Sequence, residues 1–434
     1  MTTPDARDVP ADPLSIERLS STGLEYRVVD LTDDARAEAF QRAADRGFLG
    51  AEPSAESLAA ARKTYLTRRN VGVYEPGVAA TAFPVATTNA WVTPMTLPGG
   101  GEIDMWAISM VTVAATHRRR GIARALLEGE LRAAAAAGIP VAGLTVSEAT
   151  IYGRYGFGSA LPVLAFTVDT RRAGWSGPTA PGRVEYVDRE TLALDLAAVH
   201  ARARRSAPGR IPGWQGRWEG LSGAAPTTPE RDKVRGVRYL DETGEVCGAL
   251  AYRLTERGDS FRFDLDVRLL VAETPDAVSA LWRFALQHDL VDEVTADLRP
   301  LDDPLPWLVL DQRGVTATVH DHGWLRIIDV PAALTARRYS APLDVTIRVD
   351  DALGFAAGDW RLRVDAGGAA TVDRVEGRAV DLALDVSALS SLYAGSVRAA
   401  SLQGAGRVDG DGEAIGALDR AFVAFPAPSL DIWY

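Results

Sequence analysis

The spacing of apolar positions predicts a strand–helix–strand unit in the first third of the chain. Met105 to Val113 is rich in apolar and β-branched residues and predicts a strand. From Gly121 to Ala137 apolar positions recur at helical spacing, and an alanine run adds helix propensity before a glycine and a proline end the pattern. Val141 to Val146 predicts a second strand. Because one helix connects the two strands, we expect them to be parallel.

A second unit with the same order predicts a weak internal repeat. Phe263 to Val271 and Glu293 to Leu298 have strand character, and Ala277 to Asp289 between them has helical spacing. Thr274 is the expected N-cap of that helix, with Pro275 in its first turn. The loop before the helix lacks the positive charge and the glycine that an anion would need.

The last third of the chain has a different pattern. Leu343 to Val349, Trp360 to Val364 and Val380 to Val386 alternate between apolar and polar residues, as half-buried antiparallel strands do. Two helices are expected near Leu389 to Arg398 and Glu413 to Phe425. This pattern predicts an α+β domain with one sheet and helices on a face.

Loops rich in glycine, proline and serine divide the 434 residues into blocks. The division predicts a flexible leader and then three domains, with boundaries at 1–23, 24–170, 171–312 and 313–434. The first two domains are expected to be α/β and the third α+β.

Composition excludes several classes of protein. A net charge of −11 argues against nucleic acid or an anionic membrane as partner and suits a cationic substrate. A single cysteine, Cys247, excludes an internal disulfide, and the five histidines form no HExxH motif, so we expect no metal site. No segment reaches the ~18 apolar residues of a membrane span, and the first 20 residues lack the apolar core of a signal peptide. We therefore expect a cytoplasmic protein without a membrane span.

The strongest chemical signal is the segment Arg118 to Ala123, which fits R-x-x-G-x-A between the first strand and its helix. A helix N-terminus offers unpaired N–H groups and a favourable dipole to an anion. Gly121 allows a close approach to a diphosphate, and the three arginines add charge and forked donors. The alternative is a solvated basic helix start.

This strand–RxxGxA–helix–strand order resembles the GCN5-related N-acetyltransferases (GNAT), whose loop binds the pyrophosphate of acetyl-CoA. The resemblance implies acetyl-CoA as co-substrate. It implies that the strand before the loop lines the pantetheine arm and that the loop holds the pyrophosphate. The implied coenzyme-binding residues are Val111, Thr112, Val113, Arg118, Arg119, Arg120, Gly121, Ile122, Ala123, Arg124, Ser147 and Glu148.

A narrower resemblance spans all three blocks in order. The segments Val113 to Gly121, Ser147 to Gly158, Asp303 to Pro306 and Trp324 to Leu334, with Gly395 after Leu392-Tyr393, are similar to the enhanced intracellular survival (Eis) acetyltransferases. That family implies two tandem GNAT-like domains, the second degenerate, then a sterol-carrier-like domain, and a homohexamer.

Two catalytic residues follow from the resemblance. Acetyl transfer needs a neutral amine, donors for the oxyanion and a proton for the leaving thiolate. Tyr152 matches the tyrosine that protonates the thiolate in family members; a packing role in a Gly-rich turn is the alternative. The resemblance implies that the base is the α-carboxylate of Tyr434. The alternative is a frayed chain end, whose carboxylate would not be held in the active site. The apolar ending Leu430 to Tyr434 favours burial.

The substrate stays open at this level. Polycationic small molecules such as aminoglycosides suit the acidic chain, whereas protein lysine, a longer acyl donor and a lipid-binding or scaffold role are alternatives. Trp433 stands where the family often has an acidic residue, and the segment from Asp45 to Glu52 matches the family poorly. Asp45 and Glu52 are candidate amine contacts, or else structural surface carboxylates.

Overall fold

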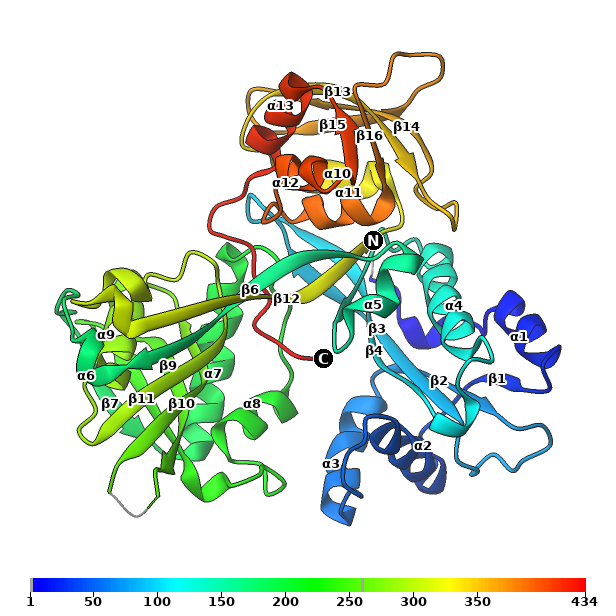
Figure 1. Ribbon diagram of the computed structural model, residues 1–434. Coiled ribbons are helices and arrows are strands. Elements are labelled where there is room, and N and C mark those ends of the chain that lie inside the picture. Colours follow the sequence, from blue (N-terminus) through cyan, green and yellow to red (C-terminus); the bar gives the residue numbers. More distant parts are fainter. Residues whose placement is uncertain (1–2, 259–260) are drawn as a thin grey trace. The chain divides into compact units, whose positions relative to one another are not determined.

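The computed structural model describes residues 3–258 and 261–434 of the chain (Figure 1). The chain divides into two compact units. Unit 1 contains residues 1–160, 323–424 and 433–434, and unit 2 contains residues 161–322 and 425–432. The first and third blocks of the sequence therefore share a unit, while the second block stands in the other.

The first block is a twisted sheet with helices. Its strands follow the order β1 (Glu25–Val28), β2 (Arg69–Tyr74), β3 (Ala86–Thr96), β4 (Glu102–Val113) and β5 (Val141–Thr145), and the end of β12 (Val315–Ile327) pairs antiparallel with β5. The helices are α1 (Pro13–Ser20), α2 (Asp34–Gly47), α3 (Ala55–Tyr65), α4 (Ile122–Ala136) and the short α5 (Ala149–Tyr152). As predicted, β4 and β5 are parallel and α4 connects them.

The core of this block lies between α4 and the sheet. Leu127 and Leu131 of α4 pack with Trp106 of β4 and with Phe157. The same helix also buries Glu130, which accepts hydrogen bonds from Arg69 of β2 at 3.2 Å and from the indole of Trp106 at 3.1 Å. A buried carboxylate with a guanidinium partner ties the helix to two strands.

The predicted flexible leader, 1–23, instead folds in its described part. Asp12 caps α1 by accepting a hydrogen bond from the Ser15 N–H, and Arg132 of α4 donates to Asp12 at 2.7 Å. Leu19 is fully buried. The apolar side of this short helix and its ion pair to α4 hold the segment against the first block. The acidic, proline-containing composition of the segment gave no sign of these contacts.

Unit 2 contains most of a run of paired strands in the order β6 (Gly158–Asp169), β11 (Val291–Arg299), β10 (Phe263–Ala272), β9 (Val246–Glu256), β8 (Val234–Leu240) and β7 (Arg183–Val187). Its helices are α6 (Thr170–Ala173), α7 (Arg189–Ala203), α8 (Gln215–Ser222) and α9 (Pro275–Leu286). β10 and β11 are parallel around α9, and Thr274 caps α9 by accepting from the Ala277 N–H. The strand–helix–strand order of the first block therefore recurs in the second block, as predicted.

The third block forms a five-stranded sheet in the order β15 (Ala370–Arg374), β14 (Gly358–Val364), β13 (Leu343–Asp350), β16 (Leu382–Asp385) and β17 (Val408–Gly410). Helices α10 (Val330–Ala336), α11 (Val386–Tyr393), α12 (Ala399–Gly404) and α13 (Gly412–Phe422) complete it. The prediction was wrong in one respect, because β16 runs parallel to β13. Alternation shows which face of a strand is buried but not its direction.

Among the described residues, no helix is both long enough and apolar enough for a membrane crossing.

Candidate active site

The site begins where β4 and β5 separate. Their parallel pairing ends at Ala107 and Gly143, so the last six residues of β4 have no pairing with β5. On the other side of β4, two residues, Met110 and Val111, face the single residue Thr88 of β3, and Met110 has a φ of 56°. This bulge bends β4 away from its neighbour. The separated strands leave backbone groups open to a ligand between them.

The predicted anion loop lies at the end of β4 and enters α4. Gly121 is the N-cap of α4 with φ 76°, and Arg119 has φ 64°. The cap makes no side-chain hydrogen bond, so the first N–H groups of the helix remain for a ligand. A side chain at Gly121 would meet no atom within 4 Å, and the glycine serves the positive φ, since L-residues resist that conformation.

A cavity of about 830 Å³ extends from the strand opening along this loop. Eleven of the twelve predicted coenzyme-binding residues line it, namely Val111, Thr112, Val113, Arg118, Arg119, Gly121, Ile122, Ala123, Arg124, Ser147 and Glu148. Arg120 is the exception. Its guanidinium donates to the Thr22 carbonyl at 3.0 Å and lies 4.0 Å from Glu75. Arg120 therefore braces the loop against the turn after α1 instead of facing the cavity.

Tyr152 lies at the C-terminal end of α5 and lines the same cavity. Its ring packs edge-on against Phe157, with ring centroids 6.2 Å apart. Burial, with a smaller contribution from the negative charge of Glu148, raises the pKa of the Tyr152 phenol above its usual value. The phenol is therefore held in its protonated form at neutral pH.

The final residue, Tyr434, lies against β5. Thr145 Oγ1 donates to a terminal oxygen of Tyr434 at 2.6 Å and accepts from the Tyr434 N–H at 3.3 Å. The ring of Tyr434 packs edge-on against Trp91, with ring centroids 5.2 Å apart. The guanidinium carbon of Arg68 lies over the Trp91 ring, 3.7 Å from its centroid. Burial lowers the pKa of Arg68 to about 10. These contacts fix the position of Tyr434.

Tyr152 and Tyr434 line one smaller cavity of about 270 Å³, which also touches Met110 at the bulge and Thr145 of β5. Val111, Ser147, Phe48 and Tyr152 belong to both cavities. The two sequence-predicted catalytic residues thus line one cavity at the strand opening. As expected from its composition, the segment before them is buried at Leu430 to Ile432, whereas Trp433 is half exposed.

The two candidate amine contacts differ. Glu52 is exposed and pairs with Arg42 at 2.8 Å, as a structural surface carboxylate does. Asp45 is partly buried near Tyr65, whose hydroxyl approaches the Met110 sulfur at 3.9 Å. Burial raises the pKa of the Asp45 carboxyl. Of the two, Asp45 is the better candidate for an amine contact. A cationic amine beside this carboxylate would compensate for the solvation that burial removes from it.

Several lining residues carried no signal in the sequence. Phe48 follows α2 and reaches both cavities, and Leu353 belongs to a loop of the third block. His117 also lines the larger cavity, and its Nε2 pairs with Glu75 at 2.7 Å. His117 stood within the segment Val113 to Gly121, whereas Phe48 and Leu353 are brought in by packing from other parts of the chain.

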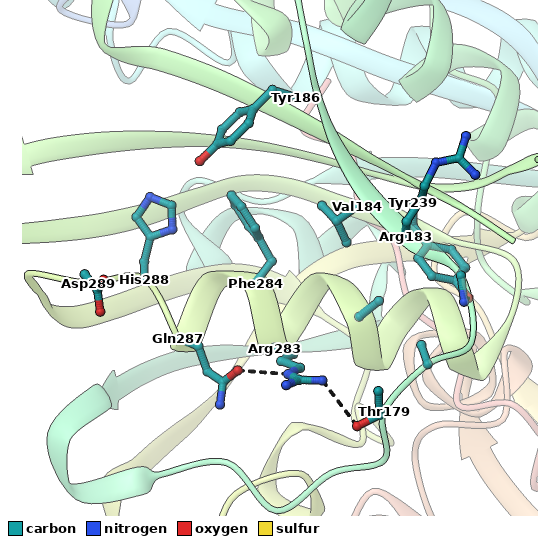
Figure 2. A pocket seen from close by; sticks show the side chains of 13 residues that line it. Thr179, Arg183, Val184, Tyr186, Tyr239, Arg283, Phe284, Gln287, His288 and Asp289 are labelled. Carbon is teal, nitrogen blue, oxygen red and sulfur yellow. Dashed lines mark hydrogen bonds between the residues drawn. The ribbon is translucent and has the colours of Figure 1, made fainter.

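In the second block, the cavity that the structure describes lies away from the start of the helix. This hollow has a volume of about 620 Å³ and is lined by the C-terminal half of α9 and by β7; Figure 2 shows its lining side chains. Arg283 donates to Gln287 and Thr179, and Phe284 packs against Tyr186 and His288. At the N-terminus of α9, Pro275 has no N–H to offer an anion.

Within the described residues no three His, Cys, Asp or Glu side chains come together as a metal site would require.

Comparison with known proteins defines the class. Residues 28–160 and 210–327 each match an acetyltransferase (GNAT) domain, and residues 330–431 match a sterol carrier protein domain. The protein is therefore an acetyltransferase with two GNAT domains and a sterol-carrier-like third domain. GNAT enzymes take the acetyl group from acetyl-CoA.

Relatives narrow the class further. The chain is 35% identical over 393 residues to an uncharacterized N-acetyltransferase of Streptomyces avermitilis. The aligned region covers 88% of this chain and 92% of that protein. It is 34% identical over 346 residues to the N-acetyltransferase Eis of Mycobacterium tuberculosis, covering 76% and 81%. The crystal structure of Eis1 from Mycobacterium abscessus matches with a TM-score of 0.80 at 30% identity, covering 94% and 100%. The chain belongs to the Eis family of N-acetyltransferases.

Proposed function

We propose that this protein transfers the acetyl group of acetyl-CoA to amines of polycationic small molecules such as aminoglycosides. The observation that carries the proposal is the cavity at the strand opening, which Tyr152 and the terminal residue Tyr434 both line. It joins the arginine-lined cavity through shared residues, so a coenzyme held along the loop would reach both tyrosines. The acidic net charge of −11 favours a cationic acceptor.

Each residue has a defined task in this proposal. Bound acetyl-CoA supplies the thioester carbonyl that the amine attacks. The carboxylate of Tyr434 accepts a proton from the incoming ammonium group, with Thr145 holding it in place. Tyr152, kept protonated by burial, donates a proton to the leaving sulfur. Arg118, Arg119 and the first turn of α4 hold the pyrophosphate.

The acid is tested by Tyr152→Phe. We expect kcat to fall about 100-fold, within the usual contribution of general acid catalysis, with unchanged affinity for CoA. The measurement is steady-state release of CoA thiol, with CoA binding followed by calorimetry. Tyr155→Phe is the matched control, because Tyr155 lines the larger cavity but not the smaller one. A normal kcat in Tyr152→Phe would remove this residue from the mechanism.

The base is tested at Tyr434. One alanine added after Tyr434 moves the carboxylate away from Thr145 and should lower kcat at least tenfold. Tyr434→Phe is the matched control, since it keeps the carboxylate and the ring beside Trp91. If the extended protein turns over at the normal rate, the carboxylate is not the base.

Other acceptors and donors are alternatives within the same chemistry. A protein lysine could replace the small amine, and a longer acyl chain could replace acetyl. A panel of aminoglycosides, lysine peptides and acyl-CoA donors, read by thiol release, ranks them by kcat/KM. A lipid-binding or scaffold role predicts no thiol release with any amine.

We further propose a homohexamer, which the family resemblance supports. Light scattering after size exclusion should give six times the mass of one chain.

A further inference from the structure

The cavity along the arginine loop has one wall from an unexpected part of the chain. Ala352 and Leu353 line it together with Arg118, Arg124 and Tyr155 of the first block. Both belong to the loop 351–357, which joins β13 and β14 of the sterol-carrier-like domain. Neither lines the smaller cavity that holds Tyr152 and Tyr434. The third domain therefore reaches the coenzyme cavity away from the catalytic end.

The loop is held by a buried ion pair. Arg326 of β12 donates to both carboxylate oxygens of Asp351, at 2.7 and 2.9 Å, and the two side chains are 0% and 2% exposed. Arg326 also donates to the Tyr155 carbonyl at 2.8 Å. Asp351 in turn accepts from the N–H groups of Leu353 and Ala356, at 3.0 and 2.8 Å. One guanidinium thus connects the loop to the turn that follows Tyr152.

The two domains also approach closely beside this pair. The Ser387 hydroxyl of α11 donates to the Phe157 carbonyl at 2.8 Å. A side chain at Gly158 would lie 2.0 Å from the Ser387 carbonyl oxygen, so only glycine permits this contact. Leu353 packs against the apolar cluster that contains Tyr155 and Phe157. The loop is therefore seated against the first domain by packing as well as by charge.

We propose that the loop 351–357 is part of the coenzyme site and that Leu353 contacts the nucleotide end of acetyl-CoA. The inference rests on the proposed use of this cavity by acetyl-CoA. Leu353 offers an apolar surface in the cavity that the basic loop also lines, which suits the face of an adenine ring beside a pyrophosphate. The third domain then contributes to coenzyme binding as well as carrying the chain end.

The first test removes the apolar contact. Leu353→Ala should raise the Kd for CoA and the KM for acetyl-CoA about tenfold, with kcat at saturation unchanged. With S-acetylpantetheine, which lacks the nucleotide, kcat/KM should be the same in wild type and variant. Leu194→Ala, an exposed leucine on α7 of the other unit, is the control and should change none of these values.

A second pair of variants leaves the packing intact. Ala352 is exposed, so Ala352→Glu and Ala352→Arg should both fold with the wild-type melting temperature. Because the coenzyme is an anion, Glu should weaken CoA binding severalfold and Arg should tighten it. Both changes should shrink as salt is raised.

The outcomes separate the two proposals. If wild type binds no CoA, the proposed function fails. If wild type binds CoA but Leu353→Ala and both Ala352 variants bind it equally well, the loop has no part in the site. An equal loss with S-acetylpantetheine would place Leu353 beside the pantetheine arm and overturn the assignment to the nucleotide.

Discussion

At the scale of single residues, burial decides what each ionisable group can do. It keeps the phenol of Tyr152 protonated by raising its pKa, and it makes the loss of a partner costly for each buried charge. The protonation state of an ionisable side chain near the cavity therefore depends on how closely other side chains pack around that group.

The pH dependence of turnover should follow from Tyr152. An acid acts only while protonated, and the pKa of this phenol is raised from 10.0. Activity from this group is therefore present at lower pH and lost only as pH rises past that raised value. We expect kcat under saturating substrates to show no alkaline fall below about pH 10. A profile of kcat against pH checks this, and a fall near pH 8 would contradict it.

Asp431 should stabilise the segment before the chain end. It is buried in unit 2, with His200 Nε2 at 3.2 Å and Arg210 at 3.6 Å. Burial by itself would raise the pKa of this carboxyl, but the charge of Arg210, with His200 and Arg217, outweighs it and holds the pKa well below its usual range. Its stabilisation is therefore present above about pH 4 and lost as pH falls.

Asp431→Asn should lower the free energy of unfolding at neutral pH by about 3–5 kcal/mol, because it leaves buried cations without their anion. Urea denaturation measures the change. Asp232→Asn, whose side chain is 94% exposed, should leave the midpoint where it was. Equal midpoints for Asp431→Asn and wild type would show that this cluster does not anchor the segment.

At the scale of elements, the join between β4 and α4 positions the anion loop. The helix begins at a residue with positive φ, and the strand before it is bent by a bulge. These two features place the first turn of the helix, with its orphan N–H groups, in the wall of the larger cavity.

Gly121→Ala tests the join. The new methyl group meets no atom within 4 Å, so steric blocking is small, but φ 76° costs an L-residue about 1–2 kcal/mol. We expect stability to fall by about that amount and CoA affinity to fall severalfold. Gly220→Ala on α8, also without neighbours within 4 Å and without a positive φ, should leave CoA affinity unchanged. An unaltered Kd for CoA in Gly121→Ala would show that the loop tolerates another geometry.

Most elements near the site could be predicted from the sequence because their signals are local. The helix over residues 122–136 and the cap at Thr274 follow from spacing and from residue type. The parallel pairing of β16 with β13 could not be predicted, since it depends on how a long connection returns. Arg120 stood in the right motif yet faces the turn after α1, because side-chain direction is set by neighbours from elsewhere in the chain.

At the scale of the whole molecule, the order of domains along the chain differs from their grouping in space. The first and third blocks share unit 1, and residues 433–434 belong to it as well. Sequence resemblance supplied the expectation that the end of the chain reaches the first domain. Nothing local to Leu353 or Ala352 indicated that their loop lines the cavity along the arginine loop.

The net charge of −11 leads to a prediction about the acceptor. An acidic protein attracts a polycation more strongly than a monoamine, and salt screens that attraction over about 10 Å at ordinary ionic strength. We therefore expect the KM for an aminoglycoside to rise severalfold between low and high salt. The KM for a small monoamine, measured under the same conditions, should change much less. Because acetyl-CoA is itself an anion, which we propose is bound by arginines, its concentration must be saturating at every salt level, and kcat should then stay constant. If the KM values of polycation and monoamine change in parallel, the charge of the chain does not select the acceptor, and its specificity lies in contacts such as Asp45.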